Sequence, residues 1–378
     1  MRKVILAIIL FVFTISFSQS KKKSTDEEKL TKCIAENTNY FVFNGQRPEG
    51  KAWEIIENLF AQNQFVAWGE YHNSRLLSEL TTYALESAWK NGYKTWCVEV
   101  SPFVASELMH IGKSENPLHT FTEIAQKRPK FTTFPFFETK DDISMVTTAN
   151  HLGYAVWGID QEFQMSFPYC LEKVYESLPE RKQRKMKAVY DSLQSKWWNP
   201  DAILLDRLKK EVKQHNLRNM LEDIKISKEI YYYSDNQKRA DLMKTNFYRY
   251  YNALKNENEK IFFKMGSNHL AKGMNLETNI YDIGNAVYEL SQKNKTKFSN
   301  IYLMVRYTEE KGVITDDIEE TNNQNPKVFS KLYAKDKWVL VDLTSLRLKM
   351  RYDNTLTPDT YKIIEKYDYV LVSPEVLK

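Results

Sequence analysis

Cysteine is scarce in this chain, and the spacing of its three copies excludes two classes of site. Cys33, Cys97 and Cys170 lie far apart, so the C-x-x-C pair of a zinc knuckle or a thioredoxin-type redox site is missing. Cys97 lies within the apolar run TWCVEV and is expected to be a buried core thiol. A Cys33–Cys170 disulfide stays open at this stage, because sequence alone cannot establish the pairing.

Several familiar catalytic motifs are absent as well. The chain has no G-x-S-x-G nucleophile elbow, no H-E-x-x-H pair, no Walker A loop and no G-x-G-x-x-G fingerprint. Sequence support is therefore lacking for a serine hydrolase elbow, a zincin, a P-loop and a dinucleotide site. A large excess of one charge is also missing. The 54 basic and 49 acidic residues give a net charge of +5, too small to indicate a nucleic-acid partner.

Long hydrophobic runs are limited to the N-terminus. Met1, Arg2 and Lys3 precede the apolar stretch VILAIILFVFTISF at 4–17, and SQS then supplies small residues where a signal peptidase can cut. The stretch is short for a membrane span and matches a secretory signal peptide over residues 1–19. We therefore expect residues 20–378 to form a periplasmic or secreted protein with no transmembrane segment after signal removal. An uncleaved N-terminal anchor is the alternative.

Hydrophobic residues are plentiful and follow alternating patterns. The composition, 42% hydrophobic and 27% charged, is typical of a globular protein. Short apolar runs that predict strands alternate with amphipathic stretches that predict helices. Strands are expected at 65–69, 94–100, 154–160, 261–266, 300–307, 338–343 and 367–374. This order predicts a single α/β domain with three layers, in which helices flank a largely parallel central sheet.

One segment breaks the alternation. Residues 171 to about 258 contain no convincing strand and are rich in Lys, Glu and Tyr, so several helices are expected there. The segment lies between the third and fourth expected strands. We interpret it as a helical insertion that caps one edge of the sheet.

Polar residues follow four of the expected strands. They are Glu70, Tyr71 and His72 after the first strand, Glu99 at the end of the second, Asp160, Gln161 and Glu162 at the third, and Asn268 and His269 after the fourth. Ligands of a parallel α/β sheet bind beyond the carboxyl ends of its strands, so these side chains are expected to converge. A helix N-cap would also explain Asp160, and a buried ion pair would also explain Glu99.

Two histidines carry the strongest functional signal. His72 and His269 each follow a glycine-containing strand exit, and imidazole titrates near neutral pH. In one interpretation, these histidines together with Glu70 and Glu99 would ligate a divalent metal that activates water. Alternatively, one histidine acts directly as a general base and a glutamate fixes its tautomer. The other histidines do not follow strands and are assigned structural roles: His110, His119, His151 and His215.

The sequence around these residues resembles one superfamily. It comprises the erythromycin esterases, the ChaN-type haem-uptake proteins and the TIKI/TraB-type proteases. The similar segments are WGEYH, VEV, GID, RADLMKTNF and KMGSNH. The most specific part is an R-x-x-x-M-x-x-N-F helix at 239–247 followed by a strand that ends in G-x-N-H. The resemblance spans roughly residues 60–290 and implies an α/β fold with its site at the carboxyl edge of the sheet.

The resemblance also implies a role for each residue. His72 would be the general base on water or a metal ligand, and Glu70 and Glu99 would orient it or share the metal. His269 would bind or protonate the substrate. Arg239 would stabilise the negative charge that develops on the substrate oxygen. The candidate catalytic residues are thus Glu70, His72, Glu99, Arg239 and His269. The candidate substrate-binding residues are Tyr71, Asp160, Gln161 and Asn268. The candidate metal ligands are Glu70, His72, Glu99 and His269.

The expected activity is that of an exported hydrolase in which water attacks an ester, lactone or amide bond of a small-molecule or peptide substrate. In the erythromycin esterases two residues separate the first Glu from its His, whereas here only Tyr71 does so. This spacing is nearer to the haem-uptake and protease branches, and tyrosine is a known haem ligand. The alternatives are therefore a haem- or metal-binding protein without turnover, and a degenerate member that binds a partner. The sequence leaves the cofactor open, with a divalent metal considered ahead of haem and the need for any metal undecided.

Overall fold

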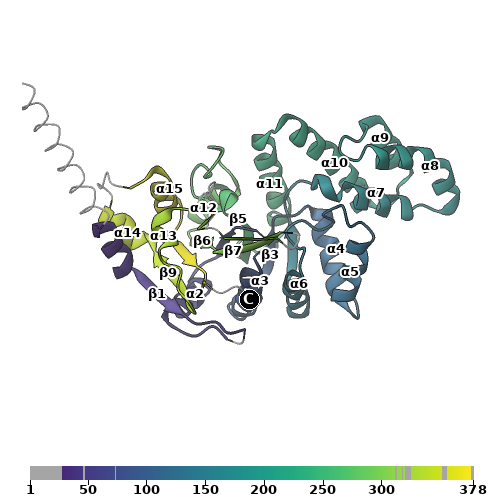
Figure 1. Ribbon diagram of the computed structural model, residues 1–378. Coiled ribbons are helices and arrows are strands. Elements are labelled where there is room, and N and C mark those ends of the chain that lie inside the picture. Colours follow the sequence, from purple (N-terminus) through teal and green to yellow (C-terminus); the bar gives the residue numbers. More distant parts are fainter. Residues whose placement is uncertain are drawn as a thin grey trace, which may run out of the picture.

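The protein is built around an eight-stranded sheet (Figure 1). The computed structural model describes residues 28–45, 47–72, 74–310, 313–316, 318–319, 325–350 and 356–375, so the expected signal peptide lies outside the described residues. The strand order is β1-β9-β10-β6-β2-β5-β3-β4. The strands are β1 (Thr38–Phe41), β2 (Phe65–Glu70), β3 (Tyr93–Val98), β4 (Ala155–Gly158), β5 (Lys260–Gly266), β6 (Phe298–Met304), β9 (Trp338–Asp342) and β10 (Tyr369–Val372).

The sheet is largely parallel, as predicted. Of its eight strands, β9 runs opposite to its two neighbours β1 and β10, and the other seven share one direction. Each strand expected from the sequence is present. The short edge strand β1 was not predicted, nor was the separate hairpin of β7 (Tyr307–Glu310) and β8 (Val313–Asp316).

Helices cover both faces of the sheet and complete three layers (Figure 1). One face carries α2 (Lys51–Gln62), α3 (Arg75–Lys90), α4 (Pro102–Gly112), α5 (Pro117–Gln126) and α6 (Lys140–Leu152). The other carries α11 (Asn236–Tyr251), α12 (Ile283–Lys293), α13 (Lys327–Ser330), α14 (Leu343–Met350) and α15 (Pro358–Lys366). Alternate residues of β2 are buried against the two layers, Val66 and Trp68 in one and Phe65 and Ala67 in the other.

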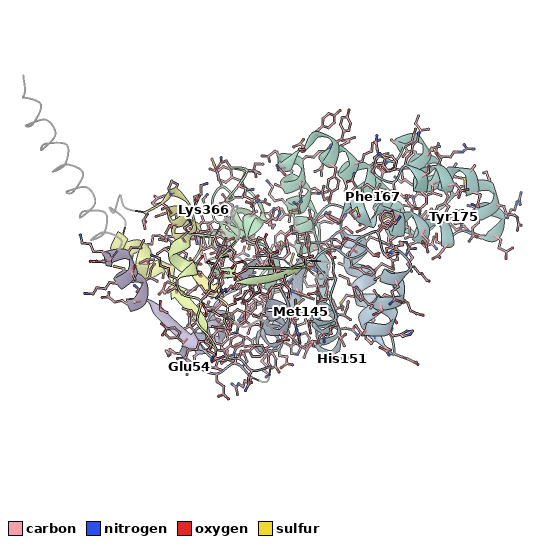
Figure 2. The ribbon with its side chains drawn as sticks, viewed as in Figure 1. Glu54, Met145, His151, Phe167, Tyr175 and Lys366 are labelled. Atoms are coloured by element: carbon pink, nitrogen blue, oxygen red, sulfur yellow. The ribbon has the colours of Figure 1, made fainter. Side chains whose placement is uncertain are left out.

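The chain between β4 and β5 is helical, in agreement with the expectation for 171–258. It forms α7 (Phe167–Glu176), α8 (Glu180–Ser195), α9 (Ala202–Glu211) and α10 (His215–Tyr233), and then returns to the sheet through α11. Helices α7 to α10 extend past the β4 edge of the sheet, and Figure 2 shows Phe167 and Tyr175 of α7 in the opposite half of the molecule from Lys366 of α15. Within the described residues, no helix has the length and apolar character needed to cross a membrane.

The cysteines are unpaired, so the candidate Cys33–Cys170 disulfide is not formed. Cys33 packs against the cluster beneath α14 and α15, whereas Cys170 is fully buried in the cluster on the opposite face of the sheet. The sheet therefore separates the two thiols. Cys97 is fully buried in the core, as predicted.

Candidate active site

Four neighbouring parallel strands, β2, β5, β3 and β4, end at the same edge of the sheet. Glu70 ends β2 opposite Gly266 of β5, and Val98 of β3 lies opposite Gly158 of β4. The residues that directly follow these strand ends therefore lie side by side. As a result, the structure brings together Glu70, His72, Glu99, Asp160 and His269, and Arg239 joins them from the first turn of α11.

Glu99 lies at the centre of this group and is contacted from four sides. Its Oε1 accepts a hydrogen bond from Arg239 Nη2 at 2.8 Å, and its Oε2 accepts one from the backbone N–H of Gly266 at 2.5 Å. The Nε2 atoms of His72 and His269 lie 3.4 and 3.3 Å from the same carboxylate. Burial would raise the pKa of Glu99, but the positive charges of His269 and His72 hold it well below its usual range.

Gly266 lets the backbone of β5 pack closely against two side chains of the site. A Cβ at this position would lie 3.0 Å from His72 Nε2 and 3.1 Å from Glu99 Oε2. A side chain here would therefore displace His72 or Glu99 by a few tenths of an ångström. The glycine of the G-x-N-H segment thus allows the backbone to approach both groups closely.

His72 is held by a second carboxylate behind it. Its Nδ1 lies 3.1 Å from Glu70 Oε1, which also accepts a hydrogen bond from Lys264 Nζ at 2.5 Å. Burial would raise the pKa of Glu70, but the Lys264 ammonium and His72 lower it. Burial would lower the pKa of His72, yet Glu99 and Glu70 raise it to about 9.

His269 has a matching arrangement. It lies in a 3-10 turn, η2 (Ser267–Leu270), and its Nδ1 is 2.8 Å from Asp282 Oδ2. Asp282 is also the N-cap of α12, because its Oδ1 accepts a hydrogen bond from the backbone N–H of Ile283. Burial and the positive charge of Arg239 would lower the pKa of His269. The negative charges of Glu99 and Asp282 outweigh them and raise this pKa to about 10.

Arg239 links the edge of the sheet to the helical segment. Its Nε and Nη2 donate to the two oxygens of Asp160 at 2.9 and 2.5 Å, and Nη2 also donates to Glu99. The helix start that presents Arg239 is capped by Asp235, which accepts from the N–H of Lys238. Asp160 is therefore the partner of Arg239 and does not cap a helix through its side chain.

The ionisable groups of the site balance in charge when both histidines are protonated. The four carboxylates are Glu70, Glu99, Asp160 and Asp282, and the four cations are Lys264, Arg239, His72 and His269. Each carboxylate contacts at least one cation. Buried charges are tolerated when they are paired in this way.

The remaining predicted residues have different surroundings. Asn268 Oδ1 accepts the backbone N–H groups of Leu276 and Glu277, so this side chain organises its own loop. Gln161 is buried, and its Oε1 has no hydrogen-bond partner among the described residues. Tyr71 is 49% exposed beside the site.

Four residues of the site were not predicted from the sequence: Lys264, Asp282, Phe136 and Tyr231. A lone lysine inside the apolar strand IFFKMG was a usable signal for Lys264, and an aspartate before a helix was a usable signal for a cap at Asp282. No sequence signal indicates Phe136, whose ring stacks on His72 with centroids 3.7 Å apart. Tyr231 lies in the last turn of α10, and its pKa is raised by burial and by the nearby charge of Asp160.

The candidate metal ligands are engaged with one another. In each histidine Nδ1 contacts one carboxylate, Glu70 or Asp282, and Nε2 faces Glu99. Lys264 and Arg239 already neutralise Glu70 and Glu99. In the part of the chain that the structure describes, no three His, Cys, Asp or Glu side chains are arranged to hold a metal ion. These four residues therefore do not fit a metal site in this arrangement, because a divalent cation would lie next to a guanidinium and an ammonium.

Solved structures share this architecture. No protein-family model and no curated protein matches the chain. A mutant of the erythromycin esterase EreC in its open conformation matches over 89% of this chain and 97% of its own, with a TM-score of 0.56 and 13% identity. A succinoglycan biosynthesis protein matches over 92% of this chain and 97% of its own, with a TM-score of 0.56 and 13% identity. A Bacillus cereus protein matches over 92% of this chain and 98% of its own, with a TM-score of 0.53 and 12% identity. The predicted resemblance is thus confirmed at the level of architecture, and this chain has the erythromycin esterase fold.

Proposed function

We propose that the protein is a hydrolase that uses His72 to activate water against an ester, lactone or amide bond. One observation carries this proposal. Two histidines point their Nε2 atoms at the same carboxylate, Glu99, and each has its Nδ1 held by a further carboxylate. Such carboxylate-oriented imidazoles are the arrangement that general acid–base catalysis requires.

The proposed reaction uses His72 in its neutral form. Glu70 accepts the N–H of Nδ1, so Nε2 carries the lone pair once it has lost the proton that it shares with Glu99 in the protonated form. Nε2 takes a proton from water while the water oxygen attacks the carbonyl carbon. When the tetrahedral intermediate collapses, the bond to the leaving group breaks and that group takes the proton from the His72 imidazolium. Water is consumed, and an acid and an alcohol or amine are released.

The other residues supply charge and position. The pKa of His269 is raised to about 10, so its Nε2 keeps a proton at neutral pH. This N–H faces Glu99 at 3.3 Å, and in the proposed reaction it turns from Glu99 to the carbonyl oxygen as negative charge develops there. Arg239 has its Nε and Nη2 donors on Asp160 and Glu99, and we therefore assign it the role of holding Glu99 between the two histidines. Glu99 in turn raises the pKa of both imidazoles.

The test is hydrolysis of a panel of esters, lactones and peptides, followed at pH 9 by the acid or amine released. His72→Gln is expected to lower kcat/KM by about 10²- to 10⁴-fold with an unchanged circular dichroism spectrum, because the general base is lost. His119→Gln is the matched control, since His119 also faces a glutamate but is 65% exposed on α5. Dialysis against a chelator is expected to leave the rate unchanged. Equal rates in the two variants, or no turnover of any member of the panel, would overturn the proposal.

We also propose that the protein is exported, on the evidence of the basic and apolar residues at 1–17. The intact mass of the protein recovered from the periplasm or medium is expected to correspond to a chain that begins near residue 20. Recovery of the full-length chain from the cell membrane would instead support an uncleaved anchor.

A further inference from the structure

A row of aromatic rings begins at His72. Phe136 stacks on the imidazole with ring centroids 3.7 Å apart and planes 18° apart. Phe163 follows at 6.1 Å from Phe136, and Tyr231 at 6.4 Å from Phe163. The three rings come from separate segments, namely the loop before α6, the loop after β4 and the C-terminal end of α10. The row therefore depends on the tertiary fold.

The far end of the row returns to the charged site. The Tyr231 hydroxyl accepts the backbone N–H of Gln164 at 3.3 Å, and the charges of Asp160 and Arg239 act on it. The row thus begins at His72 after β2, passes Phe163 after β4 and ends at Tyr231 of α10. These strands are three places apart in the sheet, about 14 Å at the usual strand spacing. His72 and Phe163 therefore follow the two outer strands of the four that contribute to the site.

Phe136 is held in an unusual backbone conformation. Its φ of 63° lies in the left-handed region, which bulky residues rarely adopt. The neighbouring residues Phe134 and Phe137 are buried in the core and fix the loop on either side. This conformation places the Phe136 ring flat on His72. Strained backbone that the surrounding fold enforces is concentrated at functional sites.

The surface beside His72 is aromatic and carries no unpaired positive charge from the site. Phe136, Phe163 and Tyr231 are each partly exposed. Both permanent cations of the site, Arg239 and Lys264, are bonded to carboxylates. A substrate carboxylate or phosphate would therefore have to compete with existing ion pairs, whereas a neutral ring would bury apolar surface against the row.

From these contacts we infer that Phe136, Phe163 and Tyr231 form an aromatic subsite for a flat, uncharged ring carried close to the scissile carbonyl. The substrate class is then a neutral arylalkyl ester, lactone or amide. This inference rests on the proposed function for the location of the reacting carbonyl, but the binding of a ring can be measured without turnover.

The direct test is the binding of two ketones that cannot be hydrolysed, phenylacetone and butanone, by calorimetry or ligand-observed NMR. The full mature chain is expected to bind phenylacetone about tenfold more tightly than butanone. Phe163→Leu is expected to weaken phenylacetone binding about fivefold, because one ring of the row is lost. Phe131→Leu is the control, since Phe131 lies on the same loop as Phe136 but packs against Trp197 outside the row. Equal Kd values for the two ketones, or equal losses in the two variants, would overturn the inference.

A kinetic measurement separates this inference from the proposed function. The three substrates are ethyl acetate, ethyl phenylacetate and benzyl acetate, which carry no ring, a ring on the acid and a ring on the alcohol. A higher kcat/KM for one of the ring esters, reduced in Phe163→Leu and retained in Phe131→Leu, is expected. Hydrolysis without any ring preference would overturn the subsite and leave the hydrolase standing. Ring-dependent ketone binding without turnover of any ester, lactone or peptide of the panel would overturn the hydrolase and leave the subsite standing.

Discussion

At residue 136 the backbone and the side chain make opposite contributions to stability. The φ of 63° disfavours any residue with a Cβ, by about 1–2 kcal/mol, whereas the ring gains contact with His72. Glycine is therefore the residue that the backbone would prefer, and phenylalanine is the residue that the site uses.

Two substitutions at this position separate the two contributions. Phe136→Ala and Phe136→Gly both remove the ring, but glycine also relieves the left-handed strain. We expect the free energy of unfolding of Phe136→Gly to exceed that of Phe136→Ala by about 1 kcal/mol, the reverse of the usual order in regular structure. Urea denaturation of the two variants measures this difference. A more stable alanine variant would show that residue 136 is not held with positive φ.

Single residues were predictable where a local pattern marks them. His72 and His269 follow glycine-containing strand exits, and this sequence feature led to the site. The residues that contact these histidines could not be predicted in the same way. Asp282 lies 13 residues after His269 across a loop, and Phe136 is 64 residues from His72. Contacts over such separations depend on how the loops fold back, which short-range patterns do not encode.

Strand β5 contains a buried lysine, which is unusual inside an apolar strand. Lys264 lies in a strand that is otherwise apolar, and its side chain is 4% exposed against 5% for its partner Glu70. The ammonium also lies 5.4 Å from the centroid of the Phe137 ring. The strand therefore holds Glu70, and through Glu70 it orients His72.

Breaking this pair is expected to be costly. Lys264→Met leaves Glu70 buried without its ammonium partner, and such a loss destabilises a protein by about 3–5 kcal/mol. The double variant Lys264→Met/Glu70→Gln removes both charges, so it is expected to recover part of that loss. Denaturant unfolding of the single and double variants provides the comparison. A single variant as stable as the wild type would mean that Lys264 does not hold Glu70.

The positions of the central strands could be predicted from the pattern of hydrophobic residues along the chain. The central strands are buried on both faces and appear in the sequence as continuous apolar runs, so β2, β3, β5 and β6 were predictable. Strand β1 was missed because TNYF is a short and mostly partly exposed edge segment with no strong alternation. The order of the strands could not be predicted, since β5 inserts between β2 and β3 only after the long helical segment has been completed.

Over the whole molecule, the site depends on a balance of charge supplied by distant parts of the chain. Four strand ends, η2, α11 and α12 contribute the charged groups, and the carboxylates among them raise the pKa of His72 to about 9 and that of His269 to about 10. The sequence predicted the convergence of Glu70, His72, Glu99, Asp160 and His269 at one sheet edge, but not the contributions of Lys264 and Asp282. It did not predict that the two histidines would share one carboxylate, because that depends on the relative placement of β3, β5 and α11.

The proposed mechanism has a definite dependence on pH. His72 must be neutral to accept a proton, and with a pKa of about 9 only about 1% of it is neutral at pH 7. Raising the pH therefore increases the active fraction until His72 is fully deprotonated. Above about pH 10 the donor proton of His269 is lost and the rate is expected to fall.

The most direct test of the catalytic role of His72 is kcat/KM of the wild-type protein from pH 6 to 10.5 on its best substrate. The proposed mechanism predicts a tenfold rise per pH unit that levels near pH 9, followed by a decline above about pH 10. A kcat/KM that is constant or falls between pH 7 and 9 would contradict the assignment of His72 as the general base.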